Sequence, residues 1–269
     1  MKSKYILSTS SSAQSRLELQ SALYEREGKN LIFQSGIVQG MRGLEIGCGT
    51  GPMTKYLSEQ VGDSGEIVVS DISQAQLDRA KENLLGSNVN NITFRLLDIN
   101  QINSLDEEFD FIYIRMMLHH LKDADEAISK AVKKIKKGGV IICEEPAIYD
   151  NSLFTYPEDE QIQEFFRWGR ACFETNNRDC DIAYRIERNL KLSGFKLTNH
   201  YLSQPVLNSS EERLMYSMTL NDLHDELIDK GIATENQYVE MCRYLEEVAK
   251  SDTMMTWVRM HHISAISVE

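Results

Sequence analysis

Positive charge and long apolar runs are both scarce in this sequence. Its 269 residues carry 29 lysines and arginines against 41 aspartates and glutamates, which gives a net charge of -12. Proteins that bind nucleic acid usually present a basic face, so we expect no nucleic-acid partner. No window reaches the roughly 20 apolar residues of a transmembrane helix, and residues 1–7 lack the apolar run of a signal peptide. We therefore predict a cytoplasmic protein without a membrane partner.

Paired cysteines are also missing. An odd, widely spaced set without a C-x-x-C pair is typical of reduced thiols, and not of a disulfide framework or a zinc site. We therefore predict no metal centre. The apolar share of 42% and the charged share of 26% are ordinary for a soluble globular protein. The five cysteines are Cys48, Cys143, Cys172, Cys180 and Cys242.

A glycine-rich turn is the most informative feature that is present. Residues 44–52 read Leu-Glu-Ile-Gly-Cys-Gly-Thr-Gly-Pro, a pattern that predicts a short buried strand, a sharp turn and a helix opened by Pro52. A helix start supplies N–H groups and a positive dipole end, and Glu45 adds an acid at the strand tip. This arrangement favours a polar, nucleotide-like ligand that carries both a carboxylate and an amine.

Two classes of cofactor use such a turn, the dinucleotides and S-adenosylmethionine. The dinucleotide fingerprint is G-x-G-x-x-G, whereas Gly47, Gly49 and Gly51 form G-x-G-x-G and Pro52 stands where the third dinucleotide glycine belongs. A glycine turn taken alone does not decide between the two classes.

Strand and helix patterns alternate between residues 41 and 143. This alternation predicts an α/β fold with a Rossmann-like, seven-stranded, mostly parallel sheet and helices on both faces. N-terminal helices and a helical lid or insert would complete it. The predicted strands are 41–46, 66–70, 92–96, 109–114 and 140–143, and the predicted helices are 53–61, 74–85 and 123–136. The last helix would have Asp123 as its N-cap, four lysines in its last turn and Gly138 at its end.

We expect residues 1–269 to form one domain. It would consist of an N-terminal helical segment (1–37), a cofactor-binding core (38–147), an aromatic-rich lid (148–180) and a part that completes the sheet (181–269). The last part would contain an acidic helical insert at 209–252.

Acidic side chains follow two of the predicted strands. Asp71 ends the second strand, where a carboxylate can accept two hydrogen bonds from a ribose diol. Asp98 follows the third strand, where it can accept a hydrogen bond from an adenine amine. Ligands of open α/β sheets bind at these strand ends.

These motifs together resemble class I S-adenosylmethionine-dependent methyltransferases. Residues 45–51, Asp71, Leu97-Asp98 and 109–112 are similar to motifs I to IV of that family, and residues 117–123 with 136–139 resemble its small-molecule, ubiquinone/menaquinone-type branch. The resemblance implies S-adenosyl-L-methionine as cofactor. Its methionine end would be held by Glu45, Gly47, Gly49 and Gly51, and its amino group by the Arg115 carbonyl. The resemblance further implies that Asp71 binds the ribose, that Ile72 lies against the nucleoside, and that Asp98 and Ile99 bind the adenine.

The candidate catalytic residues are His119 and His120, which follow the fourth strand. Methyl transfer needs alignment of the nucleophile, and a hydroxyl or ammonium nucleophile also needs a base, for which histidine is suited. Packing of one or both histidines is the alternative. Glu144 and Glu145 at the fifth strand's end either orient the substrate or lie in a solvated turn, and Tyr5 can fold over the cofactor.

We therefore predict a methyltransferase that acts on a small organic molecule as a monomer or homodimer. The sequence leaves oxygen, nitrogen and carbon open as the methyl-accepting atom. Two alternatives remain: an NAD(P)-dependent oxidoreductase, and a non-catalytic cofactor-binding or scaffold protein.

Overall fold

The computed structural model describes residues 11–87, 89–148 and 152–268, and these form two compact units. A sheet unit comprises Glu25–Pro146, Ile182–Leu202 and the described part of His261–Glu269. A helical unit comprises the described parts of Met1–Tyr24 and Ala147–Asp181 together with Ser203–Met260. The division into core, lid and insert proposed from the sequence stays a prediction.

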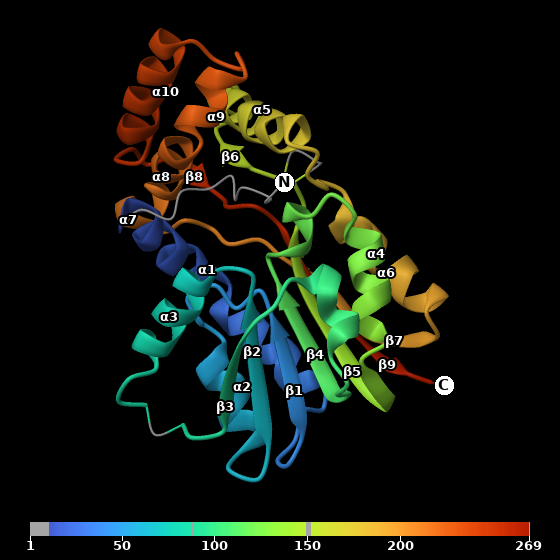
Figure 1. Cartoon of the computed structure of the whole chain (residues 1–269). Coiled ribbons are helices and arrows are strands. Elements are labelled where there is room, and N and C mark those ends of the chain that lie inside the picture. Colours follow the sequence, from blue (N-terminus) through green and yellow to red (C-terminus); the bar gives the residue numbers. More distant parts are fainter. Residues whose placement is uncertain (1–10, 88, 149–151, 269) are drawn as a thin grey trace. The chain divides into compact units, whose positions relative to one another are not determined.

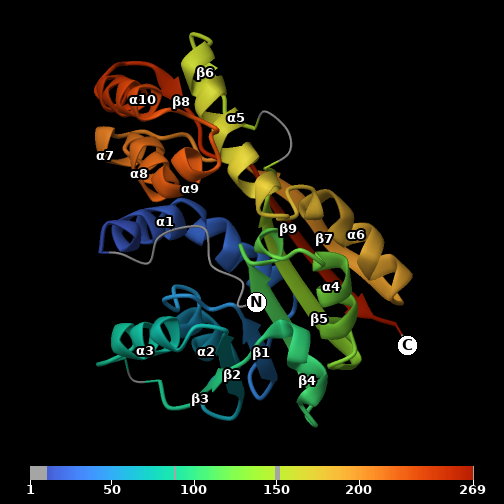
Figure 2. The ribbon, with the colours of Figure 1, turned by 45° about the horizontal axis from the view of Figure 1, so that its top comes forward.

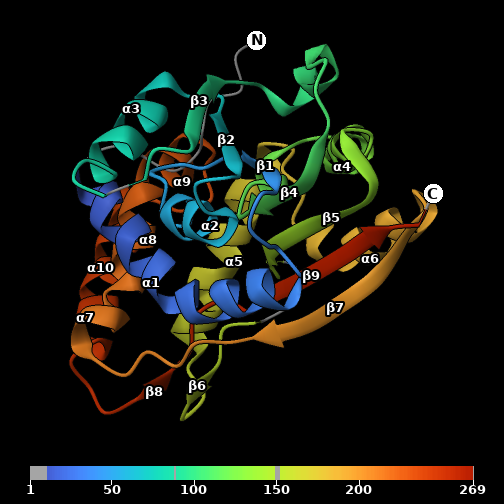
Figure 3. The ribbon, with the colours of Figure 1, turned by 90° about the horizontal axis from the view of Figure 1, so that it is seen from below.

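Seven strands form the sheet in the order β3-β2-β1-β4-β5-β9-β7 (Figure 1). The neighbours from β3 to β5 pair in parallel, and the arrows of β9 and β7 point in opposite directions (Figure 3). The strand order reverses between β1 and β4. The strands are β1 (Arg42–Ile46), β2 (Glu66–Asp71), β3 (Ile92–Leu96), β4 (Phe109–Arg115), β5 (Ile135–Pro146), β7 (Phe195–Ser203) and β9 (Met260–Ser267).

Apolar side chains cover both faces of this sheet. On one face, Leu31 of α1 (Ser11–Gln34), Leu57 of α2 (Thr54–Val61) and Leu77 of α3 (Gln74–Asn83) share a core. On the other, Ile128 of α4 (Ala124–Val132) and Ile186 of α6 (Ile182–Leu192) join a second core, to which the 3-10 helix η1 (Ile99–Ser104) also belongs. The predicted α/β fold with helices on both faces is confirmed.

In the helical unit, the helices that follow β6, which range from 4 to 16 residues in length, pack on one another (Figure 2). A buried ion pair of 2.6 Å joins Arg16 Nε of α1 to Asp222 Oδ2. No helix in the described part of the chain is both long and apolar enough to cross a bilayer. The elements are β6 (Thr155–Tyr156), α5 (Glu160–Thr175), α7 (Ser210–Arg213), α8 (Met215–Asp222), α9 (His224–Asp229), α10 (Glu235–Val248) and β8 (Met254–Met255).

The helix predicted for residues 123–136 is wrong at its C-terminal end. α4 ends at Val132, and β5 begins at Ile135, which is buried and pairs with Phe109. Lys136 therefore lies on β5, and its ammonium contacts Asp110 at 2.7 Å. Asp123 holds the N-cap position, but its side chain makes no capping hydrogen bond.

The start of α2 also differs from the prediction. Pro52 lies in the turn before the helix, and the first helical residue is Thr54. The helix predicted for 74–85 is right in type and in start: Ser73 caps α3 by accepting a hydrogen bond from the Gln76 N–H.

Candidate functional site

The carboxyl ends of the parallel strands define the candidate site. β1, β2, β4 and β5 end side by side, and the order reverses between β1 and β4. Ligands of open α/β sheets bind outside the strands' carboxyl ends at such a reversal. Apart from Tyr5, each residue predicted for cofactor or substrate lies within about five positions of one of these ends or of the end of β3.

The glycine turn after β1 is fixed by hydrogen bonds to β2. The backbone N–H groups of Gly47 and Cys48 donate to the Ser70 carbonyl at 2.8 and 3.0 Å, and the Gly49 N–H donates to Asp71 Oδ2 at 3.0 Å. Gly47, Gly49 and Gly51 have φ of 72°, 56° and 75°, a left-handed region that glycine enters without steric penalty. The turn is therefore held open in a conformation that other residues rarely adopt.

The three glycines face different surroundings. A Cβ on Gly47 would lie 2.7 Å from Met117 Cγ, and one on Gly51 would lie 3.1 Å from the Ala80 Cβ. A Cβ on Gly49 would meet nothing within 4 Å. Gly47 and Gly51 thus permit close packing, whereas Gly49 borders open space that a ligand can enter.

Glu45 is a buried acid beside this turn. Its side chain is 3% exposed, and Oε2 accepts a hydrogen bond of 2.6 Å from the Thr54 hydroxyl. Burial raises the pKa of Glu45 to about 7, although Thr54 and the charge of Arg115 oppose the rise. A cationic ligand, such as the predicted amine of the cofactor, would offset the cost of burying the ionised carboxylate and would lower this pKa.

Asp71 joins the end of β2 to the glycine turn. Oδ2 accepts from the Gly49 N–H, and Oδ1 accepts from the Ser73 N–H at 2.8 Å. Burial raises the pKa of Asp71, and these backbone N–H groups partly oppose that rise. A carboxylate has about four acceptor positions, so capacity for a diol remains. The next residue, Ile72, is an apolar side chain that is 63% exposed.

Asp98 and Ile99 follow β3 in different environments. The Asp98 carboxylate accepts hydrogen bonds from the Asn100 backbone and side chain at 2.8 and 3.0 Å, which caps η1. Ile99 is buried in the core that η1 shares with α4. Any role of Ile99 toward an adenine ring therefore falls to its backbone.

Arg115 ends β4, on the same face of the sheet as the buried carboxylate of Glu144. Glu144 is fully buried. It accepts a hydrogen bond of 2.5 Å from the Tyr113 hydroxyl and lies 2.8 Å from His262 Nδ1. Burial alone would raise the pKa of Glu144, but His262, Arg115 and Tyr113 together hold it below its ordinary value. Gly28 of α1 lies against this carboxylate, since a Cβ there would be 3.0 Å from Oε1.

His119 and His120 lie in the short 3-10 helix η2 (Leu118–His120) after β4. Both are buried, at 5% and 8% exposure, with ring centroids 4.0 Å apart. His119 Nδ1 is 2.6 Å from Glu145 Oε2. Glu145, like Glu144, is fully buried, so the alternative of a solvated turn at these two acids is wrong.

Two residues singled out in the sequence are not among those that the structure describes. Tyr5, proposed to fold over the cofactor, and Tyr149 of the aromatic lid lie outside the described residues. Within the ranges that the structure describes, no group of three or more histidine, cysteine or acidic side chains is arranged to hold a metal ion.

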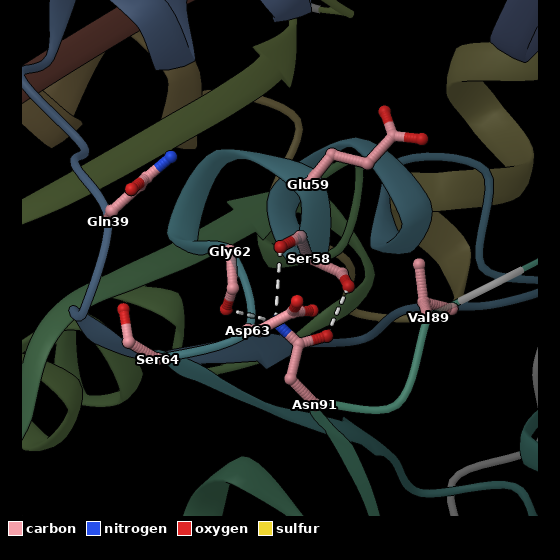
Figure 4. A pocket seen from close by; sticks show the side chains of 8 residues that line it. All are labelled: Gln39, Ser58, Glu59, Gly62, Asp63, Ser64, Val89 and Asn91. Atoms are coloured by element: carbon pink, nitrogen blue, oxygen red, sulfur yellow. Dashed lines mark hydrogen bonds between the residues drawn. The ribbon is translucent and has the colours of Figure 1, made fainter.

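A hollow of about 460 Å³ lies at the opposite, amino-terminal edge of the sheet (Figure 4). Its polar groups serve the end of α2, because Asn91 Nδ2 donates to the carbonyls of Ser58 and Gly62 at 3.1 and 2.8 Å. Asn91 therefore gives each of these carbonyls a second donor, because the Gly62 and Gly65 N–H groups already donate to them at 3.0 Å. The hollow is a C-capping arrangement and lies away from the glycine turn.

Residues 37–218 match the family model described as a methyltransferase domain, so the chain belongs to that family. It is 33% identical over 129 residues to the ubiquinone/menaquinone biosynthesis C-methyltransferase UbiE of Pseudomonas paraeruginosa, covering 48% of this chain and 50% of that protein. The chain spans about half the length of the curated relatives it matches.

Solved structures share the fold. The cyclopropane synthase MmaA2 from Mycobacterium tuberculosis has a TM-score of 0.57 and 16% identity, over 90% of this chain and 84% of that one. The phosphoethanolamine N-methyltransferase 2 of Haemonchus contortus, solved with S-adenosylhomocysteine, has a TM-score of 0.57 and 14% identity, over 96% of this chain and 58% of that one. At these identities the likeness establishes the fold alone.

Proposed function

We propose that this protein transfers the methyl group of S-adenosyl-L-methionine to a small organic molecule. The observation that carries the proposal is the glycine turn at the reversal of strand order. Its Gly49 borders open space, and the acids Glu45 and Asp71 lie directly beside it. Membership of the methyltransferase domain family supports the same conclusion.

The residues around the turn suit each part of the cofactor. Glu45 and the turn's N–H groups would hold the methionine end, where a buried carboxylate favours an ammonium partner. Asp71 has acceptor capacity for the ribose diol, and the exposed side chain of Ile72 would cover the nucleoside. Asp98 with the backbone of Ile99 would hold the adenine, and the Arg115 carbonyl would accept from the amino group.

When bound, the cofactor supplies an electrophilic methyl group on a sulfonium, and the electron pair of the broken S–C bond stays on sulfur. The chain's task is then to align the acceptor and to take a proton from it where the acceptor is a hydroxyl or an ammonium group, the latter before it can act as a nucleophile. His119 and His120 are the candidate bases because they follow β4 at the same edge of the sheet. A histidine can take up a proton near neutral pH.

The two alternatives make different predictions. A NAD(P)-dependent oxidoreductase would bind NADH, and a non-catalytic scaffold would bind S-adenosylhomocysteine without turning over the methyl donor. Family membership disfavours the oxidoreductase. We further propose that the protein works in the cytoplasm as a monomer or homodimer without a nucleic-acid partner, in line with its net charge of -12.

A turnover assay tests the proposal. The full chain is incubated with S-adenosylmethionine and a panel of small phenols, hydroxyquinols, amines and carboxylic acids, and S-adenosylhomocysteine is measured by mass spectrometry. We expect release above the acceptor-free rate with at least one class. The same assay with Asp71→Asn should lose that release. Binding of S-adenosylhomocysteine without turnover on any acceptor would instead favour the scaffold.

A further inference from the structure

Four donors converge on the buried carboxylate of Glu145. Oε1 accepts from the backbone N–H groups of Met117 and Leu118, both at 2.8 Å. Oε2 accepts from the His119 N–H at 3.4 Å and lies 2.6 Å from His119 Nδ1. An ionised carboxylate offers about four acceptor positions, so these contacts satisfy Glu145 completely at a place where its exposure is zero.

The backbone contacts fix the loop that follows β4. The loop starts at Met116, which has a left-handed φ of 51° and donates its N–H to the Glu144 carbonyl at 2.8 Å. A left-handed non-glycine residue persists only where its surroundings enforce it. The next residue, Met117, packs against Gly47 of the glycine turn. Glu145 therefore ties the loop to the turn that borders the proposed cofactor site.

The ring contact sets the state of the His119 imidazole. An ionised carboxylate has no hydrogen to donate, so Glu145 Oε2 can only accept from Nδ1, and Nδ1 carries the hydrogen. In neutral imidazole the lone pair then lies on Nε2. That nitrogen is the one that can take up a proton.

We propose that Glu145 is the positioning residue of the methyl-transfer site. It holds residues 116–120 against the glycine turn and keeps His119 in the Nδ1-protonated form. A hydroxyl acceptor bonds an oxygen lone pair to the methyl carbon, and the proton that it gives up passes to His119 Nε2. An ammonium acceptor first gives a proton to His119 Nε2, and the lone pair of the resulting amine then bonds to the methyl carbon. The catalytic part of this inference rests on the proposed function, whereas the imidazole state does not.

The substitution Glu145→Gln separates the backbone contacts at Oε1 from the contact with the His119 ring. Its amide oxygen can keep the bonds to Met117 and Leu118, while its NH₂ group faces Nδ1 and can only donate. The variant therefore keeps the two 2.8 Å backbone contacts of the loop, loses the longer 3.4 Å contact from the His119 N–H, and reverses the tautomer of His119. Glu126→Gln is the matched control, because Glu126 is 61% exposed on α4 and pairs only with Lys130 among the contacts described for it.

Nitrogen NMR of the full chain, labelled with ¹⁵N-histidine and held above pH 8, reads the tautomer directly. A His119→Gln variant assigns the resonance among the six histidines. We expect the Nδ1-protonated pattern in the wild type and in Glu126→Gln, and the Nε2-protonated pattern in Glu145→Gln. An Nε2-protonated His119 in the wild type, or one pattern shared by the wild type and Glu145→Gln, would overturn the proposal.

Calorimetry with S-adenosylhomocysteine tests the loop. Affinity should stay within about threefold of wild type in Glu145→Gln and fall at least tenfold in Glu145→Ala, which loses all four contacts. Equal affinity of Glu145→Ala and wild type would refute the positioning of the loop. If the wild type itself does not bind, the proposed function fails, while the NMR result still decides the state of His119.

Discussion

Glu45→Gln is the substitution that most sharply separates stability from function. Glu45 is nearly fully buried, and burial raises its pKa from the ordinary 4.5 to about 7. One pKa unit corresponds to about 1.4 kcal/mol. The ionised carboxylate is therefore less stable in the folded protein than in the unfolded chain by about 3 kcal/mol.

The sign of the pH dependence follows from linkage. Below pH 4.5 Glu45 is protonated in both states. Between pH 4.5 and 7 the folded protein keeps a proton that the unfolded chain has lost, so folding becomes less favourable as pH rises. Above pH 7 the full penalty applies. Glutamine keeps an oxygen for the Thr54 hydroxyl and has no proton to lose, so the gain from Glu45→Gln should grow by about 3 kcal/mol between pH 4.5 and 8.

Urea unfolding at pH 5, 6, 7 and 8 measures this gain. Far-UV circular dichroism is the suitable probe, because the two tryptophans, Trp168 and Trp257, both lie in the helical unit. The exposed Glu126→Gln variant should show a difference that does not change with pH. The same Glu45→Gln protein should bind S-adenosylhomocysteine at least tenfold more weakly. A pH-independent gain, or a Glu45→Gln protein less stable than wild type at pH 8, would refute the reasoning.

Three further predictions follow from the contacts of single residues. Asp71→Asn should weaken S-adenosylhomocysteine binding by about 1–3 kcal/mol in calorimetry, because it removes charge-assisted acceptors. Gly49→Ala should lower the free energy of unfolding by only about 1–2 kcal/mol for its left-handed φ, yet abolish most binding by filling open space; unchanged affinity would contradict this role. Gly28→Ala gains about 1 kcal/mol of helix propensity but overpacks against Glu144, a loss of about 1–3 kcal/mol. It should therefore be less stable in urea than Gly169→Ala, whose Cβ meets nothing nearer than 3.8 Å.

The parts of the fold that follow periodic patterns could be predicted from the sequence. β3 has the predicted bounds, and β1, β2 and β4 differ by one residue at one end, because β-branched runs between helical patterns leave few alternatives. Glu45 and Asp71 lie at the ends of β1 and β2, and the glycines and Asp98 come just after strands, so their common edge was also predictable.

The end of α4 was not predictable from local chemistry. Lysines followed by glycine are typical of a helix C-terminus, yet Ile135 is drawn into the core beside Phe109 and starts β5 instead. The gain from burying an isoleucine, about 2 kcal/mol, exceeds that from cations at a helix end, at most about 1 kcal/mol on an exposed surface. Tertiary packing therefore decides this boundary.

The partners of Glu144 and Glu145 were missed for a different reason. Alternation along β5 implies that neighbouring side chains face opposite sides of the sheet, and the structure follows that rule. Their partners, His262 and His119, lie 118 and 26 positions away in the sequence. Two acids in succession before a proline resemble a solvated turn, and only the position of β9 beside β5 brings His262 to Glu144.

Isothermal titration calorimetry of the full chain tests the central claim most directly, namely that the glycine turn holds an adenosyl amino acid. We expect saturable binding of S-adenosylhomocysteine with one site per chain, strongly weakened in Asp71→Asn, and no measurable binding of NADH. Saturable binding of NADH in the absence of S-adenosylhomocysteine binding would contradict the account.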